Sequence, residues 1–414
     1  MKHPNQLIAA LTGILMTASA SAGGIYLSEY GQPGQGTSGA GNSVLAEDAS
    51  TAFLNPSALF LLEGDSEWMV TGIVLDSSVK FKQDDQNTIQ GNNGGDAGDT
   101  LVGGALFHTR KLNDDWGFAF SLNSTAGSAL EYDDGFVGRY TGEDVDLLTV
   151  FFLPSVAYKV NDSFSVSAGI GAIYGEIELD QAIPPQLPNV PPAGTDGIVK
   201  FRDGDDWDAT AIASATWQVF DTWRLALTYI GETELKFDGD LDVTLPIGIS
   251  RNQISTDIEL VLPQVLSLSS LYDLNDKLSL VARLGWEDWS ELGSVPISTN
   301  QVGAEIPLNW DDTWSIGAGF RYKTGKRWNY YAGITYDSDP TEAEDRIAIL
   351  PADRQIRYSG GFTYEIDKQR TIGGTLTYID LGDARIRNEI GAGTFSGKYT
   401  TNDLYVFGVN YNWR

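Results

Sequence analysis

The chain of 414 residues contains no cysteine, so neither a disulfide framework nor thiol chemistry is available to it. Only two histidines are present. There is no metal-spaced cluster of histidine and cysteine, and no Gly-x-Ser-x-Gly elbow of a serine hydrolase. After residue 22, no stretch reaches the roughly 18 uninterrupted apolar residues of a transmembrane helix. These absences argue against a disulfide scaffold, a thiol enzyme and a helical membrane bundle.

Positive charge is also scarce. The chain has 27 Lys and Arg residues against 56 Asp and Glu residues, for a net charge of −29. A nucleic-acid partner is excluded on this ground, because phosphate binding needs clustered Lys and Arg. The Asp residues gather in pairs and short runs, as in Asp84-Asp85 and Asp133-Asp134. They predict a solvated surface, and their spacing indicates no metal site and no cofactor.

The first 22 residues have the pattern of a secretory signal peptide. Lys2 supplies the positive start, Leu7 to Ala18 is apolar, and Ala20-Ser21-Ala22 is a small-x-small cleavage site. We expect the mature protein to begin at Gly23. The alternative is an uncleaved anchor, but the apolar run is too short to span a bilayer.

The body of the chain alternates between apolar and polar residues with a period of two, which is typical of strands. One such run predicts a single apolar face over fifteen residues: Trp223, Leu225, Leu227, Tyr229, Leu235 and Phe237. Many runs begin or end in Tyr or Trp, which favour the interface between membrane and water.

Short and long connections alternate strictly along the chain. The six short ones lie at Asn113-Asp114, Asn161-Asp162, Asp221-Thr222, Asn275-Asp276, Thr324-Gly325 and Asp367-Lys368. The seven long ones are roughly 82–100, 124–143, 181–205, 239–256, 290–310, 338–354 and 381–400. Thirteen connections join fourteen strands. Short periplasmic turns opposite long extracellular loops predict an all-β fold: a 14-stranded antiparallel transmembrane β-barrel in the bacterial outer membrane.

Residues 23–65 do not alternate and are rich in Gly, Ser and Ala. They predict either a flexible tail or a hatch that plugs the barrel formed by residues 66–414. A plug has a physical reason, because a barrel of fourteen strands is too wide to be filled by its own side chains.

Several motifs carry a resemblance to a known family. They are Ser38-Gly39-Ala40-Gly41, Asp48 to Pro56 (DASTAFLNP), Gly285 to Ser290 (GWEDWS), Trp310 to Trp314 (WDDTW), and Leu350 to Arg354 (LPADR) leading into Ser359-Gly360-Gly361. Through them the chain resembles the FadL-type outer-membrane transporters of long-chain fatty acids, whose relatives are implicated in uptake of toluene-like hydrocarbons. One departure is Ser57, where the family usually has Ala after Asn-Pro.

The resemblance implies a hatch motif at Asp48, Asn55 and Pro56, with Phe53 beside the ligand. It also implies that the mature N-terminus reaches into the ligand site through Ile25 and Leu27. Finally, it implies a kink in the third strand, at residues 116–123, that opens the wall beside the hatch. The alternative is that the small residues after Asn123 simply begin a loop.

Apolar residues on the predicted inner face indicate an apolar plug or an apolar ligand rather than a water-filled pore. They are Val281, Trp289, Tyr331 and Ile379. A carboxylate head group would need a cation. The candidates are Arg139, Arg202, Arg321 and Arg354. None is singled out, which leaves a neutral ligand open.

The predicted loop 181–205 carries an apolar, proline-rich run with Ile183, Leu187 and Val190. Together with loop 124–143, it predicts a capture surface for hydrophobic ligands. The alternative is a loop stiffened by proline and packed on its neighbours.

Three functions are compatible with the sequence. Uptake of long-chain fatty acids or hydrocarbons leads, followed by a general or sugar porin and by an outer-membrane lipid-modifying enzyme. The enzyme would have to use His108, which reads better as a surface or girdle residue, so we expect no catalysis. The aromatic C-terminus (Tyr411, Trp413) resembles the signal read by barrel-assembly machinery, although Arg414 follows it. We expect a monomer surrounded by outer-membrane lipids.

Overall fold

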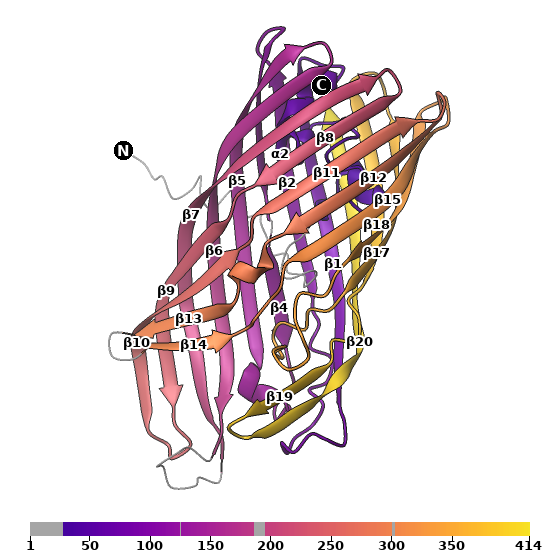
Figure 1. The fold of residues 1–414 in the computed structure, drawn as a ribbon. Helices are drawn as coiled ribbons and strands as arrows, with labels where there is room; N and C mark the ends of the chain where they lie inside the picture. Colours follow the sequence, from indigo (N-terminus) through magenta and orange to yellow (C-terminus); the bar gives the residue numbers. More distant parts are fainter. Residues whose placement is uncertain (1–27, 125, 186–194, 300–302) are drawn as a thin grey trace.

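The computed structural model describes residues 28–124, 126–185, 195–299 and 303–414. They form a closed antiparallel β-barrel of fourteen strands, as predicted (Figure 1). The predicted signal peptide, Ile25, Leu27, Leu187 and Val190 lie outside the described residues. No helix within these ranges is long and apolar enough to cross a membrane.

Fourteen strands make up the wall, and each pairs with the next until the last closes on the first. In order around the barrel they are β1 (Ser66–Gln83), β2 (Thr100–Lys111), β3 (Trp116–Asn123), β5 (Asp144–Asn161), β6 (Phe164–Ile183), β7 (Gly197–Phe220), β8 (Trp223–Ile230), β11 (Val265–Asp273), β12 (Leu278–Glu287), β15 (Thr313–Lys323), β16 (Trp328–Asp337), β17 (Gln355–Glu365), β18 (Arg370–Asp380) and β20 (Gly393–Trp413).

Six further strands continue this wall toward the long loops. They are β4 (Gly127–Glu131), β9 (Thr233–Thr244), β10 (Ser250–Leu262), β13 (Ser294–Thr299), β14 (Gly303–Pro307) and β19 (Ile386–Ile390). The helical turns are η1 (Pro33–Thr37), α2 (Thr51–Leu54), η2 (Pro56–Leu61), η3 (Arg139–Thr141) and η4 (Trp289–Glu291).

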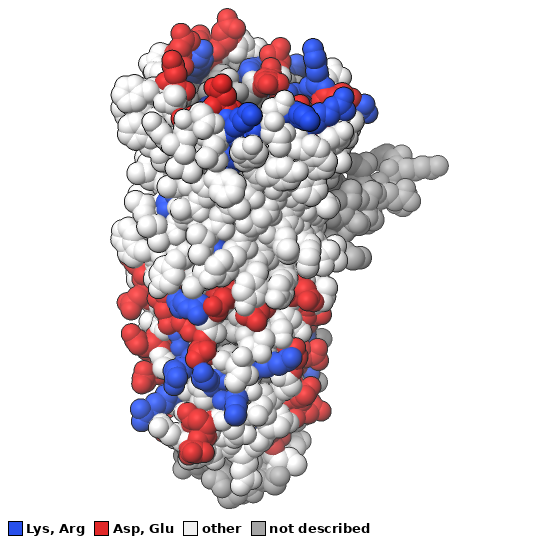
Figure 2. All heavy atoms as spheres, turned by 90° about the vertical axis from the view of Figure 1, so that its right-hand side faces the viewer, with Lys and Arg blue, Asp and Glu red and all other residues white. Residues whose placement is uncertain are grey.

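Both ends of the barrel meet at the short-turn end, where Trp68 of β1 pairs with Trp413 of β20. Figure 2 shows a belt with few charged atoms below this end, and a broad charged region that reaches to the long-loop end. Outward side chains in β12 and β20, such as Leu284 and Val409, are more than half exposed. The belt matches the hydrocarbon core of a bilayer, and the charged region extends beyond it.

The long loops are shorter than predicted, because several strands continue into them. The predicted loop 181–205 is partly strand: β6 ends at Ile183 and β7 begins at Gly197, with Leu179 opposite Phe201. In these extensions the alternation of apolar and polar residues is interrupted. Ala182 and Phe201 are buried, but the run from Arg202 to Asp206 has no apolar side chain.

The prediction of one continuous apolar face over residues 223–237 is wrong. Leu227 and Tyr229 of β8 point outward, whereas Leu235 and Phe237 of β9 are fully buried and point inward. The two residues between the strands, Gly231 and Glu232, leave the ladder and reverse the faces. The apolar residues occupy odd-numbered positions both before and after this pair, so the sequence pattern gives no sign that the faces are reversed.

The wall is also interrupted beside β3. The β2–β3 ladder ends where Leu106 pairs with Leu122, and β4 pairs with β5 from Gly127 onward. Within the described residues, no ladder joins residues 100–105 of β2 to β4. The next bond across this gap runs from the Glu131 amide to the Ala97 carbonyl oxygen (3.1 Å). Val102 is 53% exposed on the outer surface at this level.

The N-terminal segment, residues 28–62, contacts opposite sides of the barrel wall. Its η1 packs on β15, β16, β17 and β18, and its η2 packs on β2, β3, β5, β6 and β7. Close approach requires glycine in the wall: a Cβ on Gly333 would lie 2.2 Å from the Thr37 carbonyl oxygen, and one on Gly408 would lie 2.6 Å from Gly31. Ser38 Oγ donates to the Gly333 carbonyl oxygen at 2.9 Å.

The Asn55-Pro56-Ser57 motif fixes the other side of this segment. Asn55 Nδ2 donates to the Ser43 carbonyl oxygen (2.6 Å) and to Thr216 Oγ1 of β7 (2.8 Å). The Ser57 hydroxyl, which replaces the usual Ala, donates to Asn55 Oδ1 at 2.6 Å and lies 2.8 Å from Thr216 Oγ1. Ser57 therefore adds a hydrogen bond between the N-terminal segment and the barrel wall.

Asp48 of the same segment is buried, and its Oδ1 accepts a bond from the Ser50 amide at 2.9 Å. Burial raises the pKa of Asp48 from 3.8 to about 6, against the lowering effect of the bonds from Ser50. The folded state therefore favours the neutral carboxyl of Asp48. The free energy of unfolding falls as the pH rises from 3.8 to about 6, because this carboxyl ionises more readily in the unfolded chain.

Replacing Gly333 by Leu is expected to displace η1 while the strand ladders stay intact. The Gly333→Leu protein should still show heat-modifiable gel mobility, but it should conduct ions steadily in a planar bilayer, because the N-terminal segment no longer fills the lumen. Gly391→Leu, where a Cβ would meet nothing within 4 Å, is the matched control and should stay silent. A silent Gly333→Leu channel would contradict this seating of the segment.

The Asp48→Asn variant is expected to be more stable than the parent at about pH 8 and to lose that advantage at about pH 4, where the parent's carboxyl is already neutral. The measurement is the temperature at which the folded band disappears on a heat-modifiable gel. Replacing the exposed Asp65 by Asn is the control. An advantage independent of pH would show that Asp48 acts through packing instead.

Candidate ligand-binding site

An apolar cavity of about 70 Å³ lies inside the barrel on the long-loop side. Every residue that lines it is Val, Leu or Ile except one serine. They are Ser128, Val145, Leu147, Ile177, Leu179, Ile258, Leu260, Leu292, Val295, Ile297, Ile306, Leu308, Ile347, Ile349 and Leu350. Such a surface offers contact to a hydrocarbon and no charge to a head group.

The cavity is built from both walls and loops. β4, β5 and β6 form one side, and β10, β13 and β14 form another. The segment 347–350 in the connection between β16 and β17 folds inward and adds the last side.

A layer of charged side chains is buried elsewhere in the lumen. Arg357 forms ion pairs with Glu29 (3.4 Å) and with Asp337, and all three side chains are almost fully buried. Glu287 and Arg283 of β12 lie close enough to interact electrostatically with this group. Three carboxylates face two guanidinium groups, so the layer provides no net positive charge for an anion.

The predicted ligand residues are distributed over several parts of the lumen. Phe53 packs edge-to-face on Tyr30 and Phe151, with ring centroids 5.4 and 5.7 Å apart. Val281 and Tyr331 share an apolar cluster with Ala40, Val44 and Leu45 of the N-terminal segment. These two residues therefore pack against the N-terminal segment, which was predicted as one of two alternatives.

Trp289 and Ile379 lie elsewhere. Trp289 is fully buried, packs edge-to-face on Trp310 with centroids 5.0 Å apart, and donates from Nε1 to Glu287 Oε2 (2.9 Å). Ile379 joins a separate cluster with Ile73 and Leu75. Of the predicted ligand residues that the structure describes, none lines the cavity, although Phe53 and Trp289 belong to the same continuous apolar core as its lining.

Each predicted head-group cation is paired with a carboxylate. Arg139 pairs with Asp196 (2.6 Å), Arg202 with Glu178 (3.4 Å) and with Asp180, and Arg354 with Asp380 (3.0 Å). Arg321 pairs with Glu47 (2.7 Å) and Asp273 (3.1 Å). Sequence reasoning missed Arg283, which has no ion pair or hydrogen bond with any residue the structure describes.

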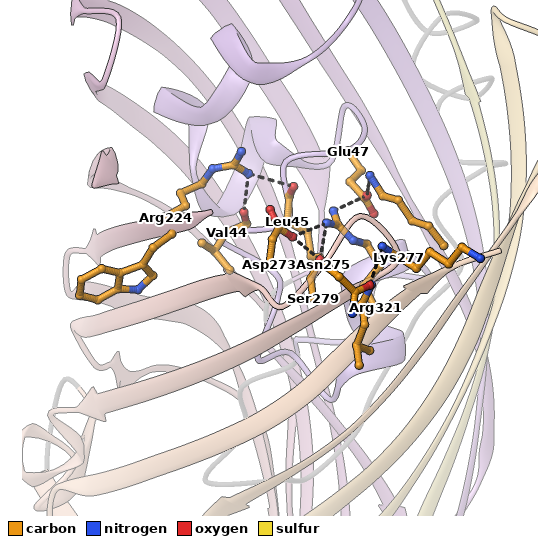
Figure 3. A network of polar contacts seen from close by, with 12 residues as sticks. Val44, Leu45, Glu47, Arg224, Asp273, Asn275, Lys277, Ser279 and Arg321 are labelled. Carbon is orange, nitrogen blue, oxygen red and sulfur yellow. Dashed lines mark hydrogen bonds and ion pairs between the residues drawn. The ribbon is translucent and has the colours of Figure 1, made fainter. Parts of the chain in front are cut away.

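Figure 3 shows the network around Arg321, which ties the N-terminal segment to the wall at the short-turn end. Glu47 accepts from Arg321 (2.7 Å) and from the Tyr331 hydroxyl (2.8 Å), and Arg224 Nη1 donates to the Val44 carbonyl oxygen at 3.0 Å. This network lines a cavity of about 460 Å³ with many charged side chains. An apolar ligand finds no favourable surface there.

His108 lies at the short-turn end of β2. Its ring stacks on Trp68 with centroids 4.1 Å apart, and its Nδ1 lies 3.0 Å from the Glu67 carbonyl oxygen. This is the position of an aromatic girdle residue.

The comparisons with curated proteins give relatives along nearly the whole chain. The chain is 23% identical to the long-chain fatty acid transport protein of Escherichia coli O6:H1, over 98% of this chain and 97% of that protein. It is also 23% identical to outer membrane protein P1 of Haemophilus influenzae, over 94% of this chain and 91% of that protein.

Solved structures agree on the fold. A FadL homologue of Pseudomonas aeruginosa superposes with a TM-score of 0.86 at 21% identity, covering 95% of this chain and 99% of its own. The toluene transporter TbuX of Ralstonia pickettii gives a TM-score of 0.71 at 18% identity, covering 94% and 99%.

The family model described as outer membrane protein transport protein (OMPP1/FadL/TodX) matches residues 13–414. With the closed barrel, the uncharged belt and the apolar cavity, this match places the chain in the outer membrane. The chain belongs to the OMPP1/FadL/TodX family of outer-membrane transport proteins.

Proposed function

We propose that the chain takes up long-chain fatty acids or similar hydrophobic molecules and releases them sideways into the outer membrane. The observation that carries this proposal is the position of β4, whose Ser128 lines the apolar cavity and whose first residue borders the gap in the wall. A ligand in the cavity is therefore one strand away from the bilayer.

Energetics favour the sideways route over exit at the short-turn end. A long apolar chain loses about 0.8 kcal/mol for each CH₂ that passes from apolar surroundings to water. The charged cavity at the short-turn end would impose this cost, whereas the gap would not. The residues at the gap are small (Gly103, Gly104, Ala105, Ala126).

Within this proposal, residues 23–65 act as the plug that prevents leakage, and the short-turn network around Glu47 holds it in place. Ile183 at the end of β6, together with Leu187 and Val190, serves as a capture surface. Ile25 and Leu27 reach toward the ligand, and the chain works as a monomer assembled by barrel-assembly machinery. The proposal includes no catalytic role, and the stacking of His108 on Trp68 supports this.

A polar substitution in the cavity is expected to impair uptake. Leu260→Asn places an amide among aliphatic side chains and should lower the initial uptake rate of hexadecanoic acid at limiting concentration by about tenfold, since an unpaired buried amide costs roughly 1–3 kcal/mol. Val261→Asn, the neighbouring residue on the opposite face of β10, is the control and should leave uptake near the parent rate. Equal rates for both variants would remove this cavity from the route.

A bulky residue at the gap is expected to block release. Ser121→Trp on β3 should reduce uptake while surface binding of the ligand persists, because the ring fills the space through which the ligand leaves. Heat-modifiable gel mobility verifies that the barrel is folded. Normal uptake by a folded Ser121→Trp protein would place the exit elsewhere.

A further inference from the structure

Three side chains with unsatisfied polar atoms lie beside the gap in the wall. Asn123 and Ser121 lie on the inner face of β3, and Ser128 follows on β4. Asn123, Ser121 and Ser128 are fully buried. Among the described residues, Asn123 is the one buried amide whose oxygen and nitrogen both lack a hydrogen-bond partner.

Such a group is costly. A buried polar atom left unsatisfied costs about 1–3 kcal/mol, and roughly nine in ten buried polar groups in proteins have a partner. The buried Asn55 illustrates the usual case, because its amide ties the N-terminal segment to β7. The side-chain amide of Asn123 makes no such hydrogen bonds. A ligand that hydrogen-bonds to this amide would therefore remove the free-energy penalty of its burial.

The chemistry of that partner follows from the amide. A primary amide presents a donor and an acceptor side by side, so it complements a neutral carboxyl or a hydroxyl, each of which also donates and accepts. An ionised carboxylate offers acceptors only and would leave Asn123 Oδ1 unsatisfied.

The charges near the gap also favour a neutral ligand over an anion. β4 ends in Glu131, and β5 begins with Asp144 and Asp146, which are paired with β4 across the ladder. Each of the four predicted head-group arginines is paired with a carboxylate. An anion buried at the gap without a cation would therefore be strongly disfavoured.

We infer, on the basis of the proposed function, that Asn123 and Ser121 bind the uncharged hydrogen-bonding head group of an otherwise apolar ligand at the gap in the wall. The ligand class is a protonated carboxylic acid or an alcohol, with its apolar tail toward the cavity that Ser128 lines. The site thereby favours single-headed amphiphiles over plain hydrocarbons, and it delivers an acid to the bilayer in its neutral form.

The test compares three ligands of one chain length: hexadecanoic acid, hexadecanol and hexadecane. Initial uptake rates are measured in cells that carry the full chain or its Asn123→Leu variant. The variant should lower the rates for the acid and the alcohol about tenfold relative to hexadecane, as expected for one or two lost hydrogen bonds. Asn329→Leu, which replaces a partly buried amide on β16 at the short-turn end, should leave the ratios unchanged.

A second readout follows the head group itself. Infrared difference spectra of the purified protein with carboxyl-labelled hexadecanoic acid should show the carbonyl stretch of a neutral acid, and this band should be absent in Asn123→Leu. Carboxylate bands alone would overturn the inference. So would an equal fall in all three uptake rates, which indicates a structural role, or unchanged ratios, which indicate that only water occupies the site. If the parent takes up none of the three ligands, the proposed function itself fails.

Discussion

In a bilayer, every backbone N–H and C=O must find a partner within the protein, because the hydrocarbon offers none. The ladder that runs from β1 around to β20 meets this demand with a closed ring. The ladder is interrupted between β2 and β4, and the proposed transport route passes through this interruption. In the proposed route, an apolar ligand leaves through this interruption, beside Gly103, Gly104 and Ala126, without breaking the barrel.

The second constraint is that a ring of this width has to be filled. Residues 28–62 cross the lumen, and wall glycines such as Gly333 let their backbone approach the strands closely. Polarity then changes along the barrel axis. An aliphatic cavity lies on the long-loop side and a charged network lies at the short-turn end. Under the proposed function, this arrangement holds an apolar ligand on the long-loop side of the lumen and disfavours its passage to the short-turn end.

Much of the architecture was accessible from the sequence. Alternation with period two, together with turn residues at regular intervals, predicted fourteen strands and the order of short and long connections. The predicted side-chain directions and strand ends were wrong where the alternation of apolar and polar residues does not follow the actual faces of the strand. Gly231 and Glu232 reverse the faces of a strand without disturbing its pattern. In the extension of β7, the run from Arg202 to Asp206 has no apolar side chain that would mark it as a strand.

The binding site was less predictable. Ile177, Leu260 and Ile347 meet in one cavity although they are far apart in the chain, and no local pattern brings them together. Val281 and Tyr331 were recognised as apolar inward residues, and in the structure they pack against the N-terminal segment. Asn123 escaped notice because a polar residue on the inner face of a barrel strand is ordinary. Its lack of partners is visible only in three dimensions.

The most direct test of the central claim is to close the gap reversibly. The chain has no cysteine, so Ala105→Cys on β2 and Ala126→Cys beside β4 can be joined by a short thiol cross-linker without side reactions. The account predicts that cross-linking stops uptake of hexadecanoic acid, that cleaving the linker restores it, and that either single-cysteine protein is unaffected. Uptake that continues at the parent rate through a verified cross-link would contradict sideways release.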